Sequence, residues 1–117
     1  TYRMTMLFDF YGDILTERQR ELFDLYYNED LSLAEIAENC GISRQGVRDV
    51  IVRAEAAMNE LEDKTGLLKR FMRMQDSVDA IVAAANEIKT INYRQYENHR
   101  LEELADSIIA GAGVLKE

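Results

Sequence analysis

Three side chains close together in the sequence carry the hydrogen-bond donors that proteins use to contact nucleic acids: Arg44, Gln45 and Arg48. Arginine can hold a guanine edge or a phosphate through two parallel hydrogen bonds, and glutamine can hold an adenine edge in a similar way. Residues four apart share one face of a helix, so Arg44 and Arg48 would lie side by side. The alternative is an exposed helix with ordinary solvated side chains.

The surface predicted from this spacing occupies the first turns of one helix, because a helix in the major groove presents its N-terminal residues to the bases. The predicted nucleic-acid-binding residues are Ser43, Arg44, Gln45, Arg48, Asp49, Val52 and Arg53. The chain carries 14 basic and 22 acidic side chains, a net charge of −8, which argues against indiscriminate binding to polyanions. Any contact with nucleic acid must therefore be local, and we expect it to be weak or conditional.

These side chains need a helix-turn-helix to position them, and residues 33–53 have the expected pattern. The small Ala37 allows two helices to cross closely, and Gly41 can adopt the left-handed conformation that ends the first helix. Ser43 is a good N-cap for the second helix, on which Val47 would fill the space between the two. An αα-hairpin that binds no ligand shares some of these features, so the pattern predicts geometry before function.

Two earlier helices, at residues 4–14 and 16–28, are predicted to pack against this motif. Thr16 and Ser32 are each followed three residues later by a glutamine or glutamate, the spacing of a capping box, so helices should begin directly after them. The second helix would direct inward Leu22, Phe23, Tyr26 and Tyr27. We therefore expect Tyr26 in the core rather than stacked on RNA bases.

A longer helical pattern follows Gly66, and we predict a helix-turn-helix domain at residues 1–65 and a helical extension at residues 66–117. Apolar residues recur in the extension at steps of four and three, the heptad spacing of coiled coils. This seam comprises Leu67, Phe71, Met74, Val78, Ile81, Ala85 and Ile88. It would pair either with the last helix of the same chain, whose end Gly111 and Gly113 should fray, or with a second copy. One short helix is a small cover for so long a seam, so we predict a homodimer.

The composition predicts an all-α fold, because the chain has no proline, only six glycines and many helix-forming residues. The only histidine is His99 and the only cysteine is Cys40, which provides no set of metal ligands and little basis for histidine-dependent catalysis. We therefore predict no enzyme activity and no cofactor, with His99 at the surface and Cys40 at an apolar position. No stretch has the length of a membrane span or the pattern of a signal peptide, so we expect a cytoplasmic protein.

Residues 4 to about 70 resemble the YlxM family of small bacterial proteins, whose helix-turn-helix is similar to region four of sigma factors. The pieces that carry the resemblance are LFDFY at 7–11, LT-x-x-Q at 15–19, LYY at 25–27, SL-x-EIAE at 32–38 and SRQ-x-V-x-D-x-I-x-R at 43–53. The sequence departs from the family pattern at Gly46, where alanine is usual, and at Arg48, Val50 and Val52. Genes of this family typically neighbour the gene for the signal recognition particle GTPase.

The resemblance implies an accessory or regulatory role in the signal recognition particle pathway, through the GTPase or the particle's RNA, and the sigma-like motif implies DNA binding. Two classes of function therefore stay open. The first is a nucleic-acid-binding regulatory protein of that pathway, and the second is a protein-binding adaptor that keeps the scaffold without nucleic-acid contact. Arginines converging with Lys64 or Arg18 on one positive face would favour the first class, and carboxylates interrupting that face would favour the second.

Overall fold

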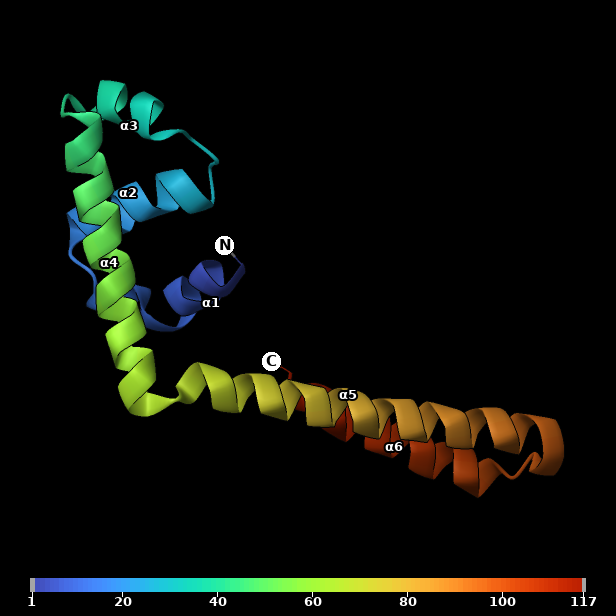
Figure 1. Ribbon diagram of the computed structural model, residues 1–117. Helices are drawn as coiled ribbons and strands as arrows, with labels where there is room; N and C mark the ends of the chain where they lie inside the picture. The colour runs from blue at the N-terminus through green and yellow to red at the C-terminus, as the bar shows by residue number, and fades with distance from the viewer. Residues whose placement is uncertain (1, 117) are drawn as a thin grey trace. The chain divides into compact units, whose positions relative to one another are not determined.

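The computed structural model describes residues 2–116, and this part of the chain contains six α-helices and no strand. The helices are α1 (Tyr2–Tyr11), α2 (Glu17–Tyr27), α3 (Leu33–Cys40), α4 (Arg44–Thr65), α5 (Leu67–Ile91) and α6 (His99–Val114) (Figure 1). A 3-10 turn, Gly12–Ile14, follows α1, and a π-helical turn, Asn92–Tyr96, follows α5. The predicted all-α fold is confirmed. Among the described residues, no helix is long and apolar enough to span a bilayer.

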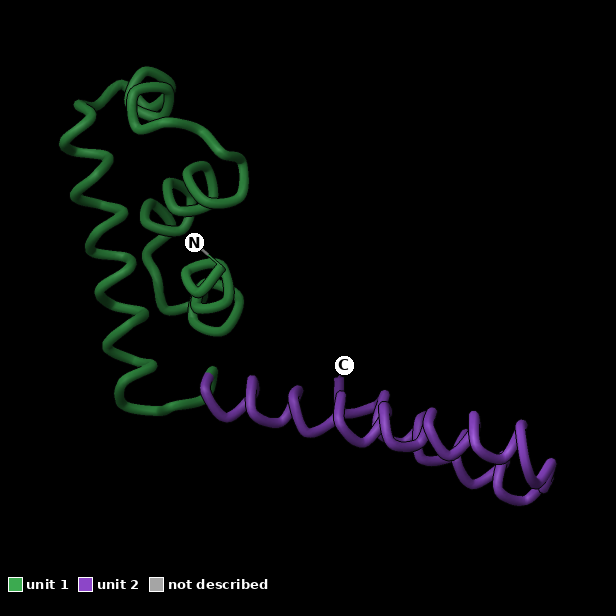
Figure 2. The backbone as a smooth tube through the Cα atoms, turned by 45° about the vertical axis from the view of Figure 1, so that its right-hand side comes forward, with its two compact units in different colours: residues 1–68 green, residues 69–117 purple. Residues whose placement is uncertain are grey.

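The chain forms two compact units, residues 1–68 and residues 69–117, coloured separately in Figure 2. The first unit contains α1 to α4, with α1, α2 and α3 packed along the same side of α4 (Figure 1). The second unit contains most of α5 together with α6. The helix-turn-helix therefore lies entirely within the first unit.

Side-chain caps start α2 and α3 where the sequence predicts them. The Thr16 hydroxyl accepts from the backbone N–H of Gln19 at 3.1 Å, and the Gln19 side chain accepts from the backbone N–H of Thr16 at 3.0 Å. Ser32 and Glu35 form the same reciprocal pair, with both distances at 3.1 Å. Each capping box satisfies two backbone donors that a helix N-terminus otherwise leaves without a partner. Both predicted capping boxes are confirmed.

The core of the first unit is built around one apolar stripe of α4. The stripe contains Val47, Ile51, Ala54 and Met58, all buried as their spacing predicts. Its N-terminal half packs with Leu22, Ile36 and Ala37 from α2 and α3, and its C-terminal half packs with Leu7, Tyr11, Leu15 and Phe23. The apolar stripe of α4 thus packs both against α3, its partner in the helix-turn-helix, and against α1 and α2.

Two expectations for the first unit were wrong. The first helix ends at Tyr11 instead of continuing to residue 14, because the chain tightens into a 3-10 turn at Gly12, where a Cβ atom would lie 3.3 Å from the Phe8 ring. Ile14 is consequently 54% exposed, while Leu15 is buried. Tyr26 is also exposed, at 36%, because it is the half-buried Tyr27 that packs on Phe23, with the two rings tilted and their centroids 4.4 Å apart.

A buried polar network, which the local sequence patterns do not predict, connects α1 to the C-terminal end of α4. The Tyr11 hydroxyl donates to the Glu62 carboxylate at 2.6 Å, and it lies 2.6 Å from the Thr65 hydroxyl. Glu62 is only 7% exposed and also accepts from the backbone N–H of Leu68 at 2.9 Å. Burial and the hydrogen bond to Glu62 raise the pKa of Tyr11, so the phenol keeps the proton that it donates. A buried carboxylate is tolerated here because several donors surround it.

We expect Tyr11→Phe to lower the free energy of unfolding of the first unit by about 1.5–3 kcal/mol, the range for hydrogen bonds to charged groups. The substitution preserves the ring but removes the only phenolic donor that reaches Glu62 from α1. Urea unfolding followed by circular dichroism measures the change. Tyr26→Phe is the matched control, because the Tyr26 side chain is exposed, and its effect should stay within about 0.5 kcal/mol. Equal stability of the two variants would contradict the role given to the network.

The second unit is an antiparallel hairpin in which α5 and α6 lie side by side (Figures 1 and 2). Its turn is closed by Asn92, whose side chain donates to the carbonyl of Asn98 and accepts from the Asn98 N–H, both at 2.8 Å. Ion pairs join the helices: Lys89 to Asp106 at 2.7 Å, and Lys116 to Asp79. The helix α6 continues through both of its glycines to Val114, so the predicted fraying there is wrong.

The seam predicted for α5 is divided by the structure. Phe71, Val78 and Ala85 are buried or half-buried, whereas four residues of the predicted seam are exposed: Leu67, Met74, Ile81 and Ile88. The covered positions of α5 within the second unit are Phe71, Gln75, Val78, Val82, Ala85 and Lys89, and Asn92 in the following turn continues the series. These positions also follow steps of four and three. Compared with the predicted seam, every second position is moved by one residue, because the seam that meets α6 includes the polar residues Gln75 and Lys89. The predicted interface is therefore corrected: three of its residues belong to the side of α5 that is covered within the chain.

Candidate nucleic-acid interface

The turn of the helix-turn-helix is formed by Gly41, Ile42 and Ser43. Gly41 has a φ of 68°, in the left-handed region that favours glycine, and ends α3. The backbone N–H of Ile42 donates back to the carbonyl of Ala37 at 3.2 Å. The Ser43 hydroxyl then accepts from the N–H of Gly46 at 2.9 Å and caps α4. One turn into α4, Val47 is fully buried against α2 and α3, as its predicted place in the motif requires.

The structure places all seven predicted binding residues at the exposed start of α4. Apart from Ser43 at the cap, they form two neighbouring rows four residues apart along the helix. One row holds Arg44, Arg48 and Val52, and the other holds Gln45, Asp49 and Arg53. The guanidinium groups of Arg44, Arg48 and Arg53 make no hydrogen bond or ion pair within residues 2–116. These arginines are therefore available to an anionic ligand.

The second row contains an internal hydrogen bond that limits what it can read. The Gln45 side-chain amide donates to the Asp49 carboxylate at 2.9 Å. This bond holds the amide in one orientation and uses one of its two N–H donors. It also places a negative charge beside the arginine row, where it opposes a phosphate. The surface thus consists of one row with a net positive charge and a second row in which the Asp49 carboxylate offsets the charge of Arg53.

Gly46 follows Gln45 in the first turn of α4, next to the second row, and is in close contact with the cap. A Cβ atom at this position would lie 3.1 Å from the Ser43 hydroxyl oxygen, tighter than the usual contact. The N–H of Gly46 is also the donor that the Ser43 hydroxyl accepts. Glycine therefore allows the close approach of the cap to the first turn of α4.

Lys64, which the sequence analysis considered as a further positive group, does not join this surface. It lies about 24 Å further along α4 from Arg48 and pairs with Glu60 at 3.1 Å. The positive charge of the candidate interface therefore comes from Arg44, Arg48 and Arg53.

A shallow cleft of about 220 Å³ adjoins the arginine row and was not anticipated from the sequence. It is lined by Tyr26, Tyr27, Leu33, Arg48, Ile51, Val52 and Glu55. Besides Arg48, the cleft exposes an aliphatic and an aromatic side chain, Val52 at 46% and Tyr26 at 36%. Burial and the Glu55 carboxylate raise the pKa of Tyr27 to about 12, so its hydroxyl stays protonated beside that carboxylate. An exposed aliphatic and an exposed aromatic side chain at a cleft are the kind of surface that binds protein partners.

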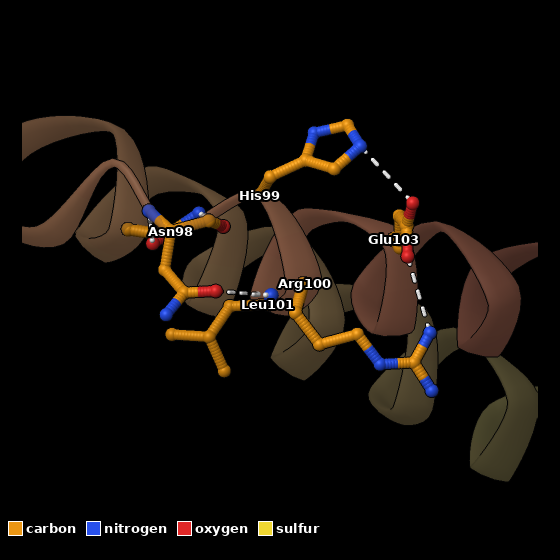
Figure 3. A network of polar contacts seen from close by, with 6 residues as sticks. Asn98, His99, Arg100, Leu101 and Glu103 are labelled. Carbon is orange, nitrogen blue, oxygen red and sulfur yellow. Dashed lines mark hydrogen bonds and ion pairs between the residues drawn. The ribbon is translucent and has the colours of Figure 1, made fainter.

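His99 and Cys40 take no part in this surface. His99 is exposed at the start of α6 and lies 3.0 Å from the Glu103 carboxylate, which also accepts from Arg100 at 3.1 Å (Figure 3). Cys40 is half-buried at the end of α3 and packs against the core around Ile36. Within residues 2–116, no three His, Cys, Asp or Glu side chains are grouped so that they could hold a metal ion.

Comparison with known proteins supports the same motif. A family model described as "Putative helix-turn-helix protein, YlxM / p13 like" matches residues 1–106. The chain is 37% identical to a UPF0122 protein of Acetivibrio thermocellus over 113 residues, covering 91% of this chain and 97% of the relative. It is 42% identical to a UPF0122 protein of Bacillus thuringiensis over 108 residues, covering 92% and 93%. A UPF0122 protein of Thermoanaerobacter sp. strain X514 is 50% identical over 78 residues, 67% of each chain.

Proposed function

Because the chain belongs to the UPF0122 family of YlxM/p13-like helix-turn-helix proteins, we propose that it is a regulatory protein that binds nucleic acid through the first turns of α4. The observation that carries this proposal is the pair Arg44 and Arg48. These exposed guanidinium groups lie one turn apart and have no partner in the described part of the chain. We propose a binding role and no catalytic one.

The two arginines suit phosphates better than bases alone. A guanidinium group binds phosphate oxygens with two parallel hydrogen bonds, and groups one helical turn apart can contact the backbone of one groove. Gln45, held in one orientation by Asp49, is the side chain placed to contact a base edge. The Asp49 carboxylate and the net charge of −8 reduce the affinity, so the proposed binding is weak and strongly salt-dependent.

We further infer that this role belongs to the signal recognition particle pathway, on the strength of the resemblance to the YlxM family. The ligand would be DNA or the particle's RNA, and the particle's GTPase is a candidate protein partner. Such a role would place the protein in the cytoplasm.

A titration of the intact protein against four targets tests the proposal. The targets are a DNA duplex, the signal recognition particle RNA, the GTPase alone, and the complex of the GTPase with the RNA. Binding is measured by fluorescence anisotropy at a low and a high salt concentration. We expect binding to the RNA or the duplex that weakens steeply with salt, because phosphate contacts release counterions.

Binding to none of the four targets would contradict both parts of the proposal. Binding to the DNA duplex alone would support the interface on α4 and contradict the assignment to the pathway. Binding to the GTPase alone, with little dependence on salt, would contradict nucleic-acid contact.

That last outcome corresponds to a second candidate function, a protein-binding adaptor, which the cleft beside Arg48 favours. Its exposed Val52 and Tyr26 could contact an apolar side chain of the GTPase. In the same titration, Tyr26→Ala is the distinguishing variant, since it removes exposed aromatic surface at the cleft without changing charge and lies outside the predicted nucleic-acid-binding residues. A loss of GTPase binding with unchanged RNA binding would support the adaptor.

A further inference from the structure

The hairpin of α5 and α6 carries a second apolar seam that neither of its two helices covers. On α5 the exposed seam contains Met74, Ser77, Ile81, Ala84, Ile88 and Ile91. On α6 it contains Leu101, Leu104, Ile108 and Gly111, and it continues to Leu115 directly after the helix. Both sets follow the heptad steps of three and four residues, every member is exposed, and none is charged. A solvent-facing side of a helix normally carries charged or polar residues instead.

The two exposed seams lie on the same side of the hairpin. One flank of the hairpin carries the two ion pairs, through Asp79 on α5 and Asp106 on α6. Each of these aspartates comes one position after a buried residue, Val78 or Ala105. The exposed seams precede the covered positions by one residue on both helices, so they lie on the opposite flank. In an antiparallel pair, equivalent flanks of the two helices meet on one side. The hairpin therefore has one flank with ion pairs and one apolar face.

The angle between the two seams of each helix is that of a four-helix bundle. A displacement of one residue rotates the side chain by about 100° around the helix axis. A helix in a four-helix bundle has two neighbours, placed at roughly a right angle to each other as seen along the bundle. Each helix of the hairpin thus has one seam that packs on the other helix of the hairpin and a second seam directed at a helix outside the hairpin.

We propose that this apolar face binds the same face of a second copy of the chain and forms a four-helix homodimer. Eight large apolar side chains of the face are between 38% and 51% exposed. They expose roughly 600 Å² per copy, so a pair would bury on the order of 1,200 Å², the lower end of the range for specific interfaces. A patch of this size is at the upper end of what monomeric proteins expose, and patches of this kind often mark interaction sites.

Charge also favours a second copy over another partner. The face contains no charged side chain that a foreign partner would have to match, and two copies offer each other seams of equal spacing. Residues 65–117 carry seven basic and eight acidic side chains, so their pairing brings little repulsion. Residues 1–64 carry seven basic and fourteen acidic side chains, which disfavours pairing through that half. The proposal does not depend on nucleic-acid binding.

Sedimentation equilibrium of the full chain at micromolar concentration tests the proposal. We expect a mass of twice 13.5 kDa for the natural sequence. The double variant Ile81→Lys, Ile108→Lys places a charge on each seam and should be monomeric. The matched control is Ala83→Lys, Ala110→Lys, which adds the same charges at exposed positions away from both seams and should stay dimeric. A monomeric natural chain, a dimeric Ile81 and Ile108 double variant, or dissociation of the control would each overturn the proposal.

A second variant keeps the test valid if the lysine pair loses helical structure. Ile81→Ala, Ile108→Ala shortens both side chains while alanine favours the helix, so the hairpin should keep its far-ultraviolet circular dichroism. We expect its dimer dissociation constant to rise at least tenfold. An unchanged constant would place the contact elsewhere and overturn the proposal.

Discussion

Replacing Val47 by aspartate should unfold the first unit. Val47 is fully buried where α4 crosses α2 and α3, and it packs against Leu22 and Ile36. An unpaired carboxylate at this crossing costs several kcal/mol, against a total stability of about 5–15 kcal/mol for a domain. Thermal unfolding followed by circular dichroism, with methyl dispersion in one-dimensional NMR spectra, measures the loss.

Val52→Asp is the matched control for this experiment. It makes the same chemical change on the same helix, but Val52 is 46% exposed, and the new charge stays in water. We expect the control to unfold within a few degrees of the natural protein, because surface substitutions usually change stability by about 0.5 kcal/mol or less. A Val47→Asp variant that melts like the control would show that Val47 is not a core residue.

The double variant Arg44→Ala, Arg48→Ala should bind nucleic acid on the order of 100-fold more weakly at low salt, about tenfold for each lost contact. Both side chains are exposed and unpaired within residues 2–116, so the fold should not change. The slope of log affinity against log salt should fall by about 1.8 for duplex DNA, since each phosphate contact contributes about 0.9. Anisotropy titrations over a series of salt concentrations measure both quantities.

Arg70→Ala, Arg73→Ala removes the same net charge from exposed positions of α5 and serves as the control. It should leave the salt slope unchanged if the contacts are local to α4. Equal losses in the two double variants would mean that net charge alone governs binding, contrary to the proposed interface.

The features that the sequence predicted well depend on residues close together in the chain. The boxes at Thr16 and Ser32 satisfy donors within their own first turns, and Gly41 ends its own helix. The buried stripe of α4 follows from helical periodicity alone. The exposed rows of the candidate interface are predictable for the same reason, because the buried position of Val47 fixes which sides of the helix face water.

The features that escaped prediction depend on side chains brought together from distant segments. Glu62 has a residue type that is normally exposed, and only the Tyr11 hydroxyl, 51 positions away, together with nearby donors makes its burial acceptable. The register of α5 was misread for another reason. The more apolar seam is the exposed one, while the covered seam contains Gln75 and Lys89, whose long side chains can bury their aliphatic parts. The cleft beside Arg48 depends on how α2, α3 and α4 meet, which periodicity does not specify.

The small side chains buried in the hairpin set how often it opens. Within residues 69–116, the buried apolar side chains are one valine and three alanines, Val78, Ala85, Ala105 and Ala112, whereas the first unit buries Phe23, Leu7, Leu22 and Met58. Each buried methyl or methylene group contributes about 0.8 kcal/mol, so the free energy of local opening is smaller in α6 than in α4. Backbone amide hydrogens of α6 should therefore exchange with deuterated solvent much faster than those of α4. In the proposed homodimer, mass action adds a dependence that a monomer would not have: the exchange of α6 should slow as the protein is concentrated, because only the closed hairpin can pair.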